Sequence, residues 1–103
     1  MYVIIWEFRV KSGLEKDFEK TYGSNGDWAN FFKQGRGYRQ TRLLHDLDAE
    51  GTYMTMDYWD SQNDFEMFKQ KMKNEYAQMD KRCEALTERE KYIGSFSLAD
   101  DKG

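Results

Sequence analysis

The first stretch of the chain, residues 2–10 (YVIIWEFRV), is rich in β-branched and aromatic residues, which is typical of a β-strand. Side chains of a strand point alternately to its two sides. One side would be wholly apolar: Tyr2, Ile4, Trp6, Phe8 and Val10. The other side begins apolar and ends charged: Val3, Ile5, Glu7 and Arg9. This pattern predicts a strand in the middle of a sheet rather than at its edge.

Helical spacing follows this strand. Ser12 and Glu15 are placed like a capping box, in which a hydroxyl and a carboxylate bind the free amides of a helix start. An apolar stripe with a period of four then consists of Leu14, Phe18 and Tyr22. We expect this helix to end between Gly23 and Gly26, and Asp27 to cap a second, short helix. The apolar side of the short helix would carry Trp28, Phe31 and Phe32.

The middle of the chain predicts a β-hairpin, because two strand-like stretches, 38–47 and 52–59, flank a turn that ends at Gly51. Ser61 and Asp64 mark the next helix start. A stripe at spacings of three and four follows: Phe65, Phe68, Met72, Tyr76, Met79, Cys83 and Leu86. It predicts one long helix, bent near residues 73–75.

Residues 91–98 (KYIGSFSL) predict a fourth strand, and 100–103 a frayed polar tail. The resulting order, β-α-(short α)-β-β-α-β, predicts a single α+β domain over residues 1–103. Its fold would be ferredoxin-like, a βαββαβ unit with a four-stranded antiparallel sheet in the order 4-1-3-2. Both helices would then cover one face of the sheet. The other face would be apolar and bare, so we expect it to pair with a second copy in a homodimer.

The composition argues against several classes of function. The net charge is −3, and the basic residues are interleaved with acidic ones, so we expect no nucleic-acid partner. No apolar run reaches about 18 residues, and the start lacks a basic segment with a cleavage site, so we expect neither membrane association nor a signal peptide. The one cysteine, Cys83, rules out an internal disulfide and favours a cytoplasmic location. We expect it to be a core residue.

Motifs for common cofactors are absent from the sequence. There is one His and one Cys, so no zinc cluster of these residues can form, and we predict no metal site and no cofactor. The scattered Asp and Glu residues are expected to form a solvated surface.

Three stretches nevertheless resemble the antibiotic biosynthesis monooxygenase (ABM) domain family of the dimeric α/β barrel superfamily. They are YVIIWEFRVKSGLEKDFEKTYG, TMDYWDSQNDFEMFK and YAQMDKRCEALTE. The resemblance covers essentially the whole chain. It implies a dimer whose two sheets close a barrel, and a cavity between the sheet and the helices of each protomer. Some members of the family oxidise polycyclic phenols with O₂ and without metal or flavin, others degrade haem, and many have no known activity.

The haem-degrading members suggest a test of the residues. Their function uses a strand-1 Asn, a strand-3 Trp and a helix His. Trp59 could match the Trp, but Glu7 lies about where the Asn would be and the helix over 65–86 has no His. The resemblance therefore disfavours haem degradation. It favours a cofactor-independent monooxygenase acting on a small aromatic or polycyclic phenolic substrate.

Candidate site residues follow from the resemblance and from the chemistry of side chains. We consider Trp59, placed by the resemblance, and His45, which titrates near neutral pH, as catalytic. The aromatic residues that could line a substrate cavity, or simply pack in a core, are Trp28, Tyr22, Phe32, Phe68 and Tyr76. Charged residues on the central strands could serve the dimer interface or the site: Glu7 and Asp57, with Arg9 and Arg42 as partners.

Three interpretations stay open at this point, because the sequence does not prove that the chain is an enzyme. It could be an ABM-type monooxygenase, a non-enzymatic domain that binds a small ligand, or a structural homodimer whose cavity is filled by its own aromatic side chains. The first two require an open cavity. The third predicts no space larger than a water molecule or two.

Overall fold

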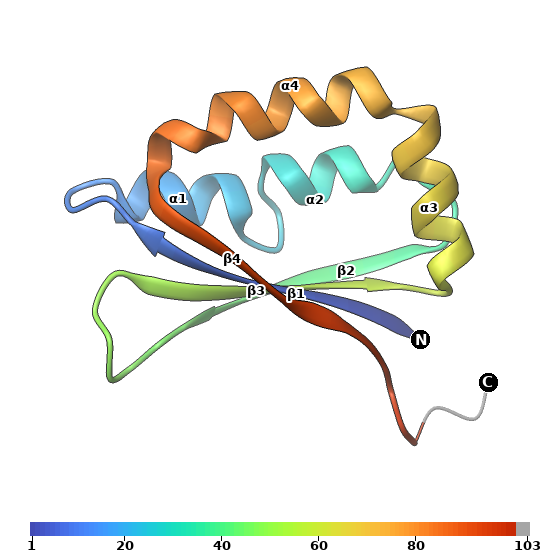
Figure 1. The fold of residues 1–103 in the computed structure, drawn as a ribbon, viewed down its shortest axis with the longest axis horizontal. Coiled ribbons are helices and arrows are strands. Elements are labelled where there is room, and N and C mark those ends of the chain that lie inside the picture. The colour runs from blue at the N-terminus through green and yellow to red at the C-terminus, as the bar shows by residue number, and fades with distance from the viewer. Residues whose placement is uncertain (101–103) are drawn as a thin grey trace.

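The computed structural model describes residues 1–100 and has four strands in one antiparallel sheet, with all its helices on one face (Figure 1). The order of the strands is β2-β3-β1-β4, as predicted. The strands are β1 (Tyr2–Val10), β2 (Tyr38–His45), β3 (Thr52–Trp59) and β4 (Thr87–Ser97). The helices are α1 (Glu15–Tyr22), α2 (Asp27–Phe32), α3 (Gln62–Lys71), α4 (Lys73–Cys83) and the 3₁₀ turn η1 (Glu84–Leu86). This is the expected α+β, ferredoxin-like fold.

The central position of β1 explains its two apolar sides. β1 pairs with β3, where Tyr2 lies opposite Trp59, and with β4, where Tyr2 lies opposite Ser97. The wholly apolar side of β1 faces the helices, since the Phe8 ring lies 5.3 Å from that of Phe18 in α1. The alternation read from the sequence therefore sorts the residues of this strand between the two faces correctly.

Aromatic rings form much of the core between the sheet and the helices. Trp59, Tyr53 and Phe18 are the largest fully buried side chains. Gly35 makes room for this packing, because a Cβ atom there would lie 2.9 Å from the Trp59 ring and 2.6 Å from that of Phe68. The core thus depends on close contact between backbone and ring at this point.

The long helix predicted over residues 65–86 is wrong in its continuity, although the predicted bend lies close to the break. α3 ends at Lys71 and α4 begins at Lys73, because Met72 has φ −106° and ψ 29° and ends the first helix. The amide of Met72 donates to the carbonyl of Phe68, and the amide of Tyr76 donates to the carbonyl of Met72. The turn directs α4 back over the sheet, which a straight helix would overshoot (Figure 1).

The helix starts agree with the sequence at one place and differ at two. The Ser61 hydroxyl caps α3 as predicted and accepts a hydrogen bond from the amide of Asp64 at 3.1 Å. The box at Ser12 is wrong: α1 is preceded by Leu14 with no side-chain cap, and Glu15 instead accepts a hydrogen bond from the amide of Gly13. Asp27 is the first residue of α2 rather than its cap.

Strand boundaries were predicted well for the central pair. β1 and β3 have the expected bounds, whereas β2 ends at His45, two residues early. β4 begins at Thr87, four residues before the expected start, because the charged residues 89–91 pair with residues 7–9 of β1 and continue the ladder. Of the polar tail, residues 101–103 lie outside the described residues.

The second face of the sheet carries no helix (Figure 1). The register places Val3 opposite Tyr58 and Phe96, and Ile5 opposite Met56, on this face. Phe96 is 46% exposed, which is high for so large an apolar ring. The expected bare apolar face is therefore present.

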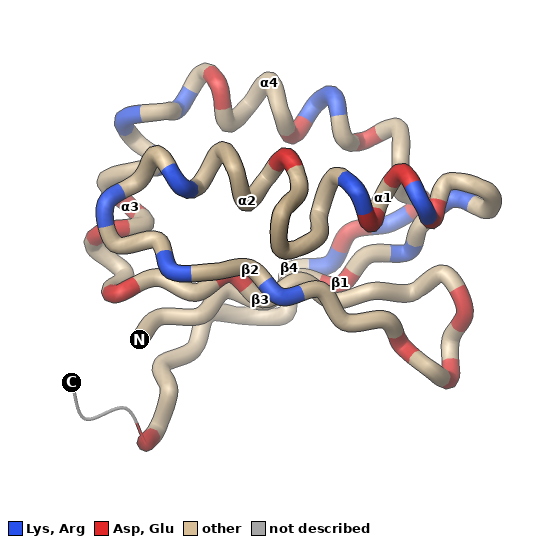
Figure 2. Tube along the Cα trace, turned by 180° about the vertical axis from the view of Figure 1, so that it is seen from behind, with Lys and Arg blue, Asp and Glu red and all other residues tan. Residues whose placement is uncertain are grey.

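Charge is spread evenly over the helical side. Figure 2 shows acidic and basic positions mixed along α1 and α4. None of the helices described is both long and apolar enough to span a membrane.

Candidate functional site

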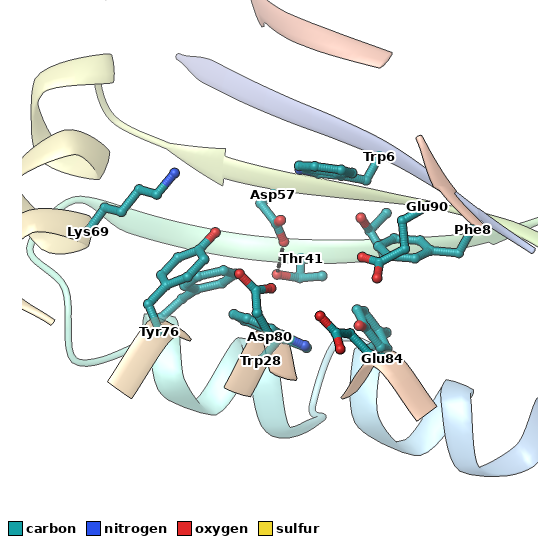
Figure 3. A pocket seen from close by; sticks show the side chains of 13 residues that line it. Trp6, Phe8, Trp28, Thr41, Asp57, Lys69, Tyr76, Asp80, Glu84 and Glu90 are labelled. Carbon is teal, nitrogen blue, oxygen red and sulfur yellow. Dashed lines mark hydrogen bonds between the residues drawn. The ribbon is translucent and has the colours of Figure 1, made fainter. Parts of the chain in front are cut away.

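A pocket of about 430 Å³ lies between the sheet and the helices (Figure 3). It receives side chains from all four strands and from the helices above them. Its lining consists of Trp6, Phe8, Tyr22, Trp28, Phe32, Thr41, Thr55, Asp57, Lys69, Tyr76, Asp80, Glu84 and Glu90. A pocket of this size can hold a small ring system. It contradicts the interpretation in which the aromatic side chains of the protein fill the cavity.

Polar groups lie on the sheet side of the pocket. Asp57 points toward the helices because it alternates along β3 with residues of the open face, and Thr41 lies opposite it on β2. The Thr41 hydroxyl donates to Asp57 Oδ1 at 2.7 Å, and the Tyr38 hydroxyl lies 2.7 Å from Thr41 Oγ1. Because Thr41 gives its proton to Asp57, Tyr38 is the donor to Thr41. A chain of three side chains thus ends at the carboxylate.

Burial raises the pKa of Asp57 to about 6, and the Thr41 hydrogen bond opposes this shift by favouring the charged form. The surface that Asp57 keeps is directed into the pocket that it lines. A carboxyl group with a pKa near 6 is mostly ionised at neutral pH and still binds a proton readily. This property is common in catalytic acids and bases.

Aromatic rings form the walls. The Trp28 ring meets the Tyr76 ring edge-on at 5.3 Å, and the Trp6 ring lies 6.4 Å from that of Phe8. Burial raises the pKa of both Tyr22 and Tyr76 well above the ordinary range, so these phenols are neutral. The walls therefore offer apolar ring faces and uncharged hydroxyl groups.

Charged side chains surround the mouth of the pocket. Lys69, Asp80, Glu84 and Glu90 are all exposed lining residues. Figure 3 shows Lys69 at one end and Glu84 and Glu90 at the other. The Lys69 ammonium lies 5.4 Å from the centroid of the Tyr76 ring, a cation–π contact.

Four of the five aromatic residues expected around a substrate line the pocket: Tyr22, Trp28, Phe32 and Tyr76. Phe68 does not. It is buried in the core, with its ring 5.4 Å from that of Trp59.

The two side chains considered catalytic lie outside the pocket lining. Trp59 is 0% exposed and packs edge-on against Phe32 with 5.7 Å between the ring centroids, and it is not among the residues that line the pocket. His45 stacks on Tyr53 at 4.6 Å near the hairpin. Trp59 was chosen from the family resemblance and His45 from the titration range of histidine. Neither criterion indicates whether a side chain reaches the pocket.

The charged residues of the central strands separate between the two faces. Glu7 lies on the open face and forms an ion pair with Arg89 at 3.7 Å, whereas Asp57 faces the pocket. Arg9 pairs with Glu88 at 3.5 Å, and Arg42 is on the open face opposite Met56. Neither arginine forms an ion pair with Glu7 or Asp57 among the described residues: both arginines lie on the face opposite Asp57, and Glu7, on their own face, pairs with Arg89 instead.

Several lining residues were not singled out from the sequence. Trp6 and Thr41 could have been found by following the alternation of their strands. Asp80 and Glu84 follow Tyr76 at intervals of four, so they lie on the apolar side of α4 and its extension. The sequence signal that could have identified Asp80 and Glu84 is a charged residue at helical spacing within an apolar stripe.

The sequence matches the model of the family described as antibiotic biosynthesis monooxygenase over residues 1–78. The chain belongs to this family. No curated protein sequence matches it.

The solved structures with a similar fold include proteins that catalyse different reactions. The cofactor-independent oxygenase SnoaB from Streptomyces nogalater is 19% identical, with a TM-score of 0.74 over 98% of this chain and 95% of that one. The heme-degrader MhuD from Mycobacterium tuberculosis is 21% identical, with a TM-score of 0.68 over 100% of both chains. A protein from Deinococcus radiodurans is 12% identical, with a TM-score of 0.76 over 100% of this chain and 97% of that one. At these identities the likeness supports the fold alone.

The lining residues of this family member do not fit a haem. None of them is a His or Cys, and the two tyrosines are held neutral by burial, which makes them poor ligands for iron. Four carboxyl groups line the pocket against one lysine, so the two propionates of a haem would meet mainly like charge.

Proposed function

We propose that this ABM domain is a cofactor-independent monooxygenase that oxidises a small aromatic or polycyclic phenol held between its sheet and its helices. The observation that carries the proposal is Asp57, a carboxyl group with a pKa of about 6 inside an aromatic-walled pocket. O₂ reacts slowly with neutral phenols and faster with their anions. The first requirement is therefore a base beside the ring.

Asp57 meets this requirement. It is ionised at neutral pH, and the hydrogen bond from Thr41 fixes the orientation of one carboxylate oxygen, so that the other is free to take a proton from the substrate. Lys69 is the one cation among the lining residues described, and its ammonium would stabilise the substrate anion.

The reaction balances without a cofactor. A CH₂ group between two rings gives one proton to Asp57, and the carbanion passes one electron to O₂. The substrate radical and superoxide combine to a peroxide, which takes the proton back from Asp57 and loses water. One oxygen atom becomes the ketone oxygen of the product, and the other leaves in the water with the two hydrogen atoms of the CH₂ group. The aromatic walls would protect the anion from bulk water.

A panel of anthrone-like phenols, incubated with and without O₂, tests the proposal. We expect O₂-dependent formation of a quinone, and a drop in kcat of about 100-fold or more for Asp57→Asn, the scale of general-base catalysis. Asp17→Asn is the matched control, because Asp17 is exposed on α1 and is not one of the residues that line the pocket.

Two results would contradict this proposal. Full activity of Asp57→Asn would remove Asp57 from the chemistry. Absence of O₂-dependent product across the panel, with the same phenols bound, would leave the alternative function, a domain that binds a small ligand without turning it over.

The homodimer belongs to the same proposal. The open face of the sheet carries Val3, Ile5, Met56 and Phe96 without helical cover, and of these Phe96 is 46% exposed. A second copy of the same face, related by a two-fold axis, is the partner that suits it. Sedimentation should give a dimer at micromolar concentration and a monomer for Met56→Lys. Met67→Lys changes a methionine that is 62% exposed on α3 and should stay dimeric. A monomeric wild-type protein would refute the interface.

We also place this activity in the cytoplasm. Cys83 is a free, buried thiol, and a reduced thiol suits a reducing compartment. Cell fractionation with an antibody against the chain tests the location, and recovery outside the cytoplasm would contradict it.

A further inference from the structure

A second pocket, of about 360 Å³, lies beside the edge strand β2 and shares part of its wall with the first. Thr41 lines both pockets, and Tyr38 lines the second. The rest of the second lining is polar and exposed: Ser24, Asn25, Lys33, Arg39, Gln40 and Arg42. A roomy pocket with so many polar groups can hold water. Tyr38 and Thr41 therefore lie between this water and Asp57.

An irregularity in β2 brings Tyr38 and Thr41 to the same side of the sheet. Residues three apart in a regular strand point to opposite sides. The pairing of β2 with β3 shifts between Tyr38 and Gln40, so that Tyr38 lies opposite Trp59 and Thr41 lies opposite Asp57. Trp59 and Asp57 are two apart, so both pairs face the helices. Irregularities of this kind often re-aim a side chain beside an active site.

The two hydroxyl groups form an unbroken chain of hydrogen bonds to the carboxylate. Tyr38 Oη lies 2.7 Å from Thr41 Oγ1. Thr41 in turn donates to Asp57 Oδ1 at 2.7 Å (Figure 3). The Tyr38 ring packs at 5.7 Å against that of Phe32 and at 5.4 Å against that of Trp59, which fixes its hydroxyl group in place. Each hydroxyl can accept one proton while it donates another, so the chain meets the geometric requirement for moving a proton.

Asp57 needs such a route when the first pocket is filled. A ring between the aromatic walls excludes water from the space that Asp57 lines. An Asp57 that is protonated at that moment cannot act as a base, and with a pKa of about 6 a fraction of the molecules is in this state at neutral pH. The way out that stays open to this proton is through Thr41.

We propose that Tyr38 and Thr41 form a proton relay that connects Asp57 with water in the second pocket while substrate occupies the first. A protonated Asp57 donates to Thr41, Thr41 donates to Tyr38, and Tyr38 donates to water. When each group passes its proton to the next, Asp57 becomes a carboxylate, the proton is on water, and Thr41 again donates to Asp57 as in the structure. The cationic side chains of the second lining favour release of the proton at this end. The inference rests on the proposed function and adds two residues that act through Asp57.

Hydrogen exchange into anthrone without O₂ tests the relay. In buffered D₂O, with the protein in excess, the CH₂ group gives a proton to Asp57, and a deuteron that returns along the relay replaces it. Mass spectrometry of the recovered anthrone measures the rate above that in buffer alone. We expect Tyr38→Phe to slow exchange about tenfold, less than the loss of a group that takes the proton itself. Quinone formation under O₂ should fall by a smaller factor, because Asp57 then returns its proton to the peroxide.

Matched variants locate the effect in the hydroxyl groups. Thr41→Val breaks the chain at its middle and should slow exchange as Tyr38→Phe does, whereas Thr41→Ser keeps the hydroxyl and should keep the exchange. This pair also tests the relay if Tyr38→Phe does not fold. Tyr92→Phe is the control, because the Tyr92 hydroxyl bonds to Ser95 and Tyr92 lines neither pocket, so both rates should stay at the wild-type value.

The outcomes separate this inference from the proposed function. If the wild type forms quinone but does not exchange, or exchanges no faster than Tyr38→Phe and Thr41→Val, the relay is wrong and the monooxygenase proposal stands. Equal losses of exchange and of quinone formation in Tyr38→Phe would indicate a structural role and also overturn the relay. Neither exchange nor quinone in the wild type would contradict both proposals.

Discussion

At the scale of single residues, the proposed chemistry depends mainly on Asp57. Two effects set the pKa of Asp57. Burial in the protein interior favours the neutral form, and the hydrogen bond from the Thr41 hydroxyl favours the charged form. Thr41 is 2% exposed, so no water competes strongly for its hydroxyl. The readiness of Asp57 to release or accept a proton near pH 6 therefore depends first on its burial and second on the hydrogen bond from Thr41.

Thr41→Val should raise the pKa of Asp57 further above about 6, because it removes the hydrogen bond that favours the carboxylate and keeps the shape of the side chain. The pKa can be followed by NMR titration of the ¹³C-labelled side-chain carboxyl. Tyr38→Phe is the matched control, since it removes a hydroxyl one step further from Asp57 and should shift the pKa less. An unchanged pKa in Thr41→Val would contradict the role assigned to Thr41.

The sequence indicates the right types of side chain for the site, but it does not indicate how deeply each side chain is buried. Asp57 was recognised as a charged group on a central strand, but the pattern alone could not assign its face to the pocket. Trp59 was favoured over it because the resemblance marks a Trp there, and Trp59 lies in the packed core. Alternation and spacing give the side of an element on which a residue lies. They do not tell a filled interior from a hollow one.

At the scale of elements, the sequence was most informative for β1 and β3, where a strict alternation leaves one register. It was least informative at the ends of helices and across Met72. The stripe from Phe65 to Leu86 keeps its helical spacing through the break, because residues on both sides of it face the sheet. The turn at Met72 follows from the packing of α4 over the sheet. This packing is a tertiary interaction, which the local sequence pattern does not show.

The two serines before helices should respond differently to substitution. Ser61→Ala should lower the free energy of unfolding by about 1 kcal/mol, since it removes the cap of α3. Ser12→Ala is the matched control and should have little effect, because Ser12 does not cap α1. Urea denaturation of both variants measures the difference. Equal losses, or a larger loss for Ser12→Ala, would contradict the assignment of these helix starts.

At the scale of the whole molecule, the sheet has one face that lines the pocket and one apolar face without helical cover, which we propose as the dimer interface. Glu7 and Asp57 separate these roles, since they lie on neighbouring central strands and face opposite ways. The stability of the whole fold is coupled to the pocket through Asp57, because a carboxylate that is costly to ionise inside the protein lowers the stability of the folded state at neutral pH.

Asp57→Asn should therefore stabilise the protein above pH 6. The folded-state pKa of about 6 exceeds the ordinary value of 3.8, so the folded state binds more protons than the unfolded state between these values, and wild-type stability falls as pH rises through this window. The variant lacks this loss. We expect a gain of roughly 1–3 kcal/mol at pH 7, and much less below pH 4. Denaturant unfolding at pH 3.5, 5 and 7 measures it, and a difference that does not grow with pH would contradict the raised pKa.

The three tryptophans lie at positions where their fluorescence can distinguish ligand binding from unfolding. Trp6 and Trp28 line the pocket, and Trp59 is sealed in the core. A ring that enters the pocket will quench or shift the emission of the first two and leave that of the third, which only unfolding exposes to water. The chain thus carries its own optical probe of occupancy together with an internal reference for the folded state.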